Sequence, residues 1–150
     1  MVNSDKNPRH SKYFEGVLQL RNHTQEIKDY INSQFPEDGS IFVSKVMKVS
    51  GGVDMFISSR RFLLKLGRNL QSRFGGEMKA SPEHFSQDRM TSKNIYRVNV
   101  LYRYRGIKKG DMISYRDETV RVDHIGKELH CINPITGNKY RIKYSDLPQH

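Results

Sequence analysis

The chain has 150 residues and a formal net charge of +10, from 26 lysines and arginines against 16 acidic residues. This length suits one ordinary domain or two small ones, and no run approaches the roughly 18 apolar residues of a membrane-spanning helix. The single cysteine excludes an internal disulfide and a cysteine-based zinc site, so we expect a cytoplasmic protein with no membrane segment, metal or cofactor.

The positive charge is concentrated in one segment. Basic and acidic residues balance over 1–59, stand at eleven against three over 60–105, and at eight against six over 106–150. A concentrated basic segment in a cytosolic protein most often meets nucleic-acid phosphate. An anionic membrane, an acidic partner and a solvated surface without a partner are the alternatives.

The first part of the chain alternates between strand and helix patterns. Residues 1–12 lack an apolar period and are predicted to be a flexible tail. Alternation over 13–21 predicts a strand, and a helix is expected from Asn22 or Thr24 to Phe35. Two strands joined by a turn at 50–52 follow. In the first of these strands one side is expected to carry Ile41, Val43, Met47 and Val49.

A second helix is predicted from about Arg60 to Phe74, ended by the glycines at 75 and 76. Its buried stripe is expected to contain Phe62, Leu63, Leu66, Leu70 and Phe74. A strand then begins at Glu77, a polar loop runs to Lys93, and a last strand covers 96–104. This order predicts a ferredoxin-like α+β domain over 13–105, with both helices on one face of an antiparallel sheet and the other face free.

Four short strand candidates occupy the rest of the chain, at 112–115, 119–125, 128–132 and 140–144. Turn residues separate them and no helical pattern lies among them. We therefore expect a small SH3-like β-barrel over 106–150, with the domain boundary near Gly106.

The second helix carries the most informative charge pattern. Arg61, Lys65 and Arg68 are spaced to share one face, and Arg60 and Arg73 flank them. No acidic residue occurs between 58 and 76 to neutralise them through i,i+4 pairs. RNA contact is therefore preferred over an ordinary solvated face.

Further basic residues follow in the loop and the last strand, interleaved with Tyr96, Tyr102 and Tyr104. Such tyrosines could stack on bases, but they share a strand face with Val98 and Val100 and are expected in the core. The strand at 52–57 lacks the RNA-recognition-motif consensus, so that fold is disfavoured. The residues expected to bind RNA are Arg60, Arg61, Lys65, Arg68, Arg73, Lys79, Arg89, Lys93, Arg97, Arg103 and Arg105.

The sequence gives little support for an enzyme. It contains no Walker A, GxGxxG or GxSxG motif, and its histidines lack metal-ligand or triad spacing. Asp54 follows the glycines at 51 and 52 and is explained by turn chemistry, and Cys131 has the character of a small buried residue. We expect neither a small-molecule substrate nor a catalytic residue.

Three stretches resemble the central region of the nonsense-mediated-decay-protein-three family. They are GGVDMF at 51–56, RFGGEMK at 73–79 and DRMTSKNIYRVNV at 88–100, and the resemblance covers about residues 13–105. Eukaryotic members of that family are adaptors for nuclear export of the large ribosomal subunit, and archaea have shorter relatives. The resemblance implies association with that subunit during its maturation or alongside translation factors.

Two departures limit what the resemblance implies. Full-length members begin with a zinc-binding region rich in CxxC pairs, and eukaryotic members end in a tail with export and import signals; the printed sequence has only Cys131 and stops at His150. Zinc, nuclear shuttling and exportin binding are therefore not implied, and an archaeal-type relative or a fragment fits best.

We therefore expect a non-catalytic protein that binds rRNA and the large ribosomal subunit. The alternative is an interaction adaptor that docks a ribosomal protein or translation factor and uses its charge only to steer the encounter. An RNA-processing enzyme would need an acid–base pair that the sequence does not show.

Overall fold

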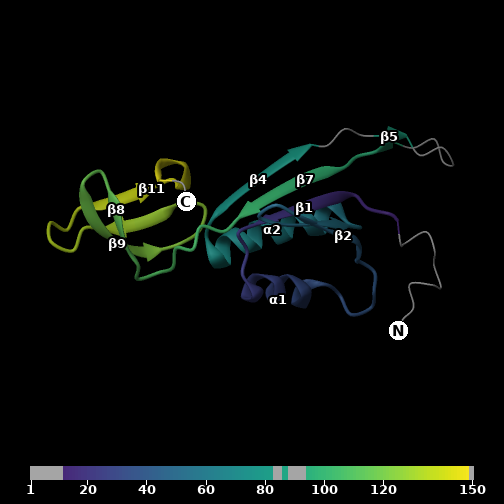
Figure 1. Ribbon diagram of the computed structural model, residues 1–150, viewed down its shortest axis with the longest axis horizontal. Helices are drawn as coiled ribbons and strands as arrows, with labels where there is room; N and C mark the ends of the chain where they lie inside the picture. Colours follow the sequence, from purple (N-terminus) through teal and green to yellow (C-terminus); the bar gives the residue numbers. More distant parts are fainter. Residues whose placement is uncertain (1–11, 83–85, 88–93, 149–150) are drawn as a thin grey trace.

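The computed structural model describes residues 12–82, 86–87 and 94–148, which form an α+β protein built around two larger sheets (Figure 1). The first sheet and its two helices are called the five-stranded unit, and the second sheet the four-stranded unit. Figure 1 shows the four-stranded unit beyond one end of strands β4 and β7. The expected α+β class is confirmed, and the expected tail lies almost entirely outside the described residues.

The elements of the five-stranded unit follow the predicted alternation. They are β1 (Gly16–Arg21), α1 (Gln25–Gln34), β2 (Val43–Val49), β3 (Gly52–Ile57), α2 (Arg60–Phe74), β4 (Glu77–Pro82) and β7 (Val98–Arg103). Between β4 and β7 the expected loop contains a short antiparallel pair, β5 (Ser86–Gln87) and β6 (Asn94–Ile95).

Both helices begin and end where their capping residues predict. The Thr24 hydroxyl accepts a hydrogen bond from the Ile27 amide at 3.3 Å, and the Ser59 hydroxyl accepts one from the Phe62 amide at 3.1 Å. Gly75 ends α2 with a φ of 71°, a conformation that costs glycine little, and its N–H donates to the Gln71 carbonyl. The predicted bounds of α2 are confirmed.

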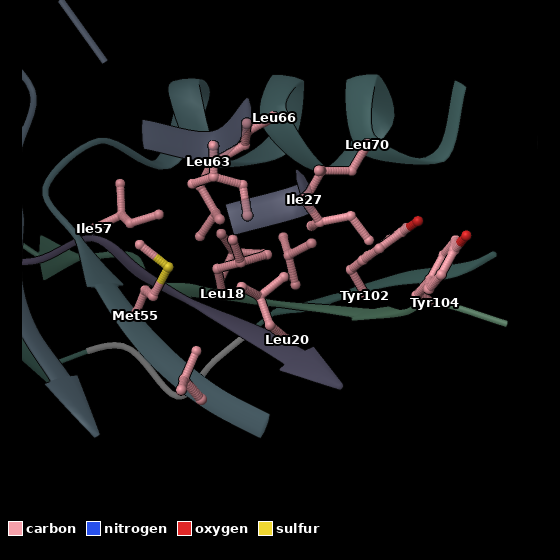
Figure 2. Close-up of a cluster of buried hydrophobic side chains, with 14 residues drawn as sticks. Leu18, Leu20, Ile27, Met55, Ile57, Leu63, Leu66, Leu70, Tyr102 and Tyr104 are labelled. Carbon is pink, nitrogen blue, oxygen red and sulfur yellow. The ribbon is translucent and has the colours of Figure 1, made fainter. Parts of the chain in front are cut away.

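One buried cluster joins the two helices to the sheet. Figure 2 shows Leu63, Leu66 and Leu70 pointing from α2 toward the inward side chains of the strands. The helix approaches closely at Gly67, where an added Cβ would lie 2.8 Å from Val100 Cγ1. Because Ile27 of α1 belongs to the same cluster, both helices cover one face of the sheet, as expected.

The expected antiparallel sheet is a mixed one. Its strand order is β2-β3-β1-β7-β4, and β1 pairs with β3 antiparallel but with β7 parallel. The strand that begins at Glu77 therefore does not pair with β1, as the ferredoxin-like order would require. The apolar alternation of β7 suits the interior of the sheet, whereas β4, with Lys79 and Pro82, suits an edge.

The expected common side of residues 41–49 is also corrected. The register between β2 and β3 shifts between Val43 and Lys45, which marks a β-bulge. Val43 packs against the core, whereas Met47 pairs with Asp54 and lies on the opposite face, with Met47 40% exposed. One inserted residue therefore exchanges the two faces of the strand.

The tyrosines of the last predicted strand divide between core and surface. Tyr102 is fully buried, Tyr104 is 8% exposed, and the Tyr102 hydroxyl donates to the Gly75 carbonyl at 2.7 Å. The core interpretation is confirmed for these two residues. Tyr96 is 54% exposed and precedes β7, so the expectation of a core position is wrong for that residue.

The four-stranded unit is an open antiparallel sheet. Its strands are β8 (Met112–Tyr115), β9 (Glu118–His124), β10 (Leu129–Ile132) and β11 (Lys139–Ile142), in the order β11-β10-β9-β8, followed by a 3-10 turn at Tyr144–Asp146. Across the described residues β8 and β11 do not pair, so the expected barrel is not closed. This unit has its own buried cluster, which includes Val120, Leu129 and Ile142. The boundary near Gly106 stays a prediction.

Glu118 should make the stability of the four-stranded unit depend on acid. Its carboxylate accepts hydrogen bonds from the Tyr140 hydroxyl at 2.6 Å and the Asn133 amide at 2.8 Å, and these bonds lower the pKa of Glu118. A lowered carboxyl pKa stabilises the folded state above the unfolded pKa, and this contribution is lost as the pH falls through the folded pKa. Glu118→Gln should therefore lower the melting temperature at neutral pH. As the pH is lowered, the melting temperature of this variant should fall less than that of the unmodified chain.

The matched control is Asp117→Asn, which removes a carboxylate from the adjacent exposed turn. Thermal melts followed by circular dichroism between neutral and acidic pH would compare the two variants. An equal fall of the melting temperature with decreasing pH in Glu118→Gln and in the unmodified chain would contradict this role of Glu118.

Candidate nucleic-acid interface

An exposed basic ridge runs along the outer side of α2. We define it by Arg61, Lys65 and Arg68, which are all exposed. Spacings of four and three residues place these side chains on one helix face, and the buried leucines hold the opposite face against the sheet. Within the described residues, no carboxylate forms an ion pair with any of the three. The ridge is therefore a rigid row of uncompensated positive charge.

The two arginines that flank the ridge are held by other parts of the protein. Arg60 donates from its guanidinium to the Tyr96 carbonyl at 2.9 Å, and its backbone amide donates to the Glu15 carboxylate at 2.8 Å. The Arg73 guanidinium lies over the Tyr30 ring, 5.0 Å from its centroid. Both arginines remain exposed, so they extend the positive surface while contributing to packing.

Lys79 and Arg103 lie on the sheet face that the helices leave uncovered. Arg103 stands between Arg21 and Glu77 in the register of β1, β7 and β4. The Arg21 guanidinium forms an ion pair with the Asp54 carboxylate at 2.9 Å. This ion pair accounts for an aspartate at position 54 better than the turn chemistry expected from the sequence. Arg103 therefore adds positive charge beside a pair that is already neutral. This face is the opposite side of the sheet from α2, and the two surfaces meet around the β4 edge.

Arg97 belongs to a group of rings and cations on the same open face. Its guanidinium lies 4.1 Å from the Phe14 ring centroid and donates to the Phe14 carbonyl. Phe14 packs edge-on against Phe56 at 4.9 Å, and Lys45 approaches the Phe56 ring from β2. No sequence pattern indicated this group, because its four members come from four separate segments.

Arg105 is a structural residue at the junction of the two units. Its side chain is 8% exposed, pairs with Glu77 at 3.0 Å, and donates to the backbone carbonyls of Tyr144 and Pro148. A guanidinium with these contacts has few free donors left for a phosphate. We therefore propose that Arg105 holds the junction together rather than contacting RNA. Arg89 and Lys93 lie outside the described residues.

Two histidines and the cysteine lie together in the four-stranded unit. Among them, no group of three or more histidine, cysteine or acidic side chains is placed to hold a metal ion. His124 and His130 stack with ring centroids 5.1 Å apart, beside a depression of about 410 Å³. Cys131 is buried next to them, and burial raises the pKa of its thiol, which disfavours the reactive thiolate. No helix of the described chain is long and apolar enough to cross a membrane.

Comparison with known proteins identifies the five-stranded unit. The family model described as NMD3, second domain, matches residues 13–103, which is more than half of the chain. Comparison with curated proteins gives no match. The matched residues contain the ridge on α2 and all five strands of the five-stranded sheet.

Proposed function

Because the chain belongs to the NMD3 family through its second domain, we propose that it binds the large ribosomal subunit by contacting rRNA, without catalysing a reaction. The family resemblance supports the ribosome as the partner. The physical support is the surface of the five-stranded unit. We place this activity in subunit maturation or alongside translation factors in the cytoplasm.

The observation that carries the proposal is the ridge of Arg61, Lys65 and Arg68. An ordinary amphipathic helix usually balances such a face with acidic residues three or four positions away, and α2 contains none. The core beneath the row holds the backbone of α2 in place, so binding requires little further ordering of the backbone. Rows of arginine and lysine on rigid elements suit contacts to phosphate oxygens.

Binding to the large subunit should weaken steeply with salt. If about five phosphates are contacted, the logarithm of the binding constant should fall with the logarithm of salt concentration with a slope of about −3.5 to −4.5. Co-sedimentation with separated large and small subunits over a salt series measures both slope and preference. Equal binding to both subunits, or a slope near zero, would contradict the proposal.

An adaptor that docks a ribosomal protein is the second candidate. Its support is the outer strand β2, where Val46 and Met47 are 54% and 40% exposed at a free edge of the sheet. Free edges can accept a strand from a partner. On this alternative, binding would survive high salt and would be lost on removing these apolar side chains.

A further inference from the structure

A groove of about 730 Å³ lies where the two units meet. It follows β4, one of the two edge strands of the five-stranded sheet, and is bounded on the other side by residues that flank β10 and β11. Arg68 of the ridge lies at this groove, and Leu101 contributes an apolar part of its wall. The ridge therefore continues into the groove through Arg68.

Both units supply positive charge to the groove. The five-stranded unit provides three of the cations and the four-stranded unit two: Arg68, Lys79, Arg103, Lys127 and Lys143. Within the described part of the chain, none of these five side chains is in an ion pair.

Acidic residues offset little of this charge. The lining includes Glu77 and Glu128, and Glu77 is already paired with Arg105. Four of the five cations are exposed, and Arg103 is half-buried. A free strand edge also presents unpaired backbone groups beside them. The groove therefore has an excess of positive charge with accessible donors.

Contacts of Arg105 join the two units at the groove. Arg105 connects Glu77 of β4 to the carbonyls of Tyr144 and Pro148. A Cβ at Gly75 would overlap the Tyr144 hydroxyl, which shows how closely the end of α2 approaches the four-stranded unit. The junction therefore brings the backbones that carry these cations together at one groove, where several phosphates of one chain could be contacted.

We propose that this groove binds the phosphodiester backbone of RNA and continues the contacts made by the ridge, so that both units share one RNA site. The inference rests on the proposed function and adds to it a contribution from Lys127 and Lys143 of the four-stranded unit. RNA is favoured over an acidic protein segment because the cations continue the ridge that we propose to contact phosphate.

The test compares two double variants of the full chain. Lys127→Ala with Lys143→Ala removes two groove cations, and Lys109→Ala with Lys139→Ala removes two exposed cations of the same unit outside the groove. Binding of each to large subunits and to protein-free rRNA is measured over a salt series. At 0.15 M salt the groove variant should bind about 10–20-fold more weakly, with a slope reduced by about 1.5, whereas the control should change by less than about 2-fold.

The outcomes separate this inference from the proposed function. Salt-dependent binding by the unmodified chain, with equal effects of the two double variants, overturns the groove and leaves the ridge as the site. No binding of rRNA or subunits by the unmodified chain overturns both. A further outcome is that polyglutamate displaces the chain from large subunits at concentrations at which free rRNA does not. That result assigns the groove to an acidic protein segment and also overturns the inference. Circular dichroism melts of the variants establish that both remain folded.

Discussion

Reversing the charge of the ridge should abolish binding to the large subunit. Arg61→Glu, Lys65→Glu and Arg68→Glu replace three phosphate contacts with repulsion, and loss of the contacts alone weakens binding about 100-fold at 0.15 M salt. Repulsion adds to that loss. The affinity of the triple variant is measured by co-sedimentation or by fluorescence anisotropy with labelled rRNA at several salt concentrations.

The fold should survive these substitutions. All three side chains are exposed and make no ion pair within the described residues, and surface substitutions of this kind usually change the free energy of unfolding by less than about 0.5 kcal/mol each. The control reverses Lys48, Lys108 and Lys109, which are exposed elsewhere and carry the same total charge. Equal loss of binding in both triple variants would show that net charge, rather than the ridge, governs association.

The same pair of triple variants separates RNA contact from steering. If a ribosomal protein is the true target and the charge only guides encounter, the ridge variant should associate more slowly while keeping its equilibrium affinity at high salt. If phosphates are bound directly, the ridge variant should also dissociate faster. Association and dissociation rates measured on immobilised subunits distinguish the two mechanisms.

Local sequence patterns were enough to predict α2 but not the sheet that it covers. The period of Leu63, Leu66 and Leu70, the Ser59 cap and the Gly75 stop all act within one turn of the helix, so the sequence contains the whole signal. The position of β7 between β1 and β4 depends on which strand buries most apolar surface, a comparison between distant segments. The bulge in β2 likewise depends on pairing with β3.

Only part of the candidate site could likewise be predicted from local sequence patterns. The ridge could be predicted, because i,i+4 spacing on a helix fixes which side chains share a face. The role of Arg105 could not, because its partners Glu77, Tyr144 and Pro148 are 28, 39 and 43 residues away. A count of arginines treats all of them as equivalent. Only the folded structure shows which guanidinium groups are already hydrogen-bonded within the protein and which are not. Lys127 and Lys143 of the groove were not predicted, because the charge balance over 106–150 is close to neutral.

Replacing Arg105 should destabilise the protein more than any substitution at the surface cations. Arg105→Ala leaves the Glu77 carboxylate without its partner and removes the donors to two backbone carbonyls in a junction where the side chain is 8% exposed. The expected loss is about 2–4 kcal/mol in the free energy of unfolding. Urea unfolding followed by circular dichroism measures it directly.

Arg103→Ala is the matched control, since it removes the same charge two residues away on the open sheet face. It should cost less than about 1 kcal/mol of stability while weakening RNA binding at the groove. Arg105→Lys sharpens the comparison, because lysine keeps the charge but lacks the planar fork that contacts three oxygens at once. If Arg105 served only as a phosphate contact, the lysine variant would be as stable as the unmodified chain and would bind RNA nearly as well. A structural Arg105 instead predicts that Arg105→Lys remains clearly destabilised, because the ammonium cannot reach Glu77 and the carbonyls of Tyr144 and Pro148 together.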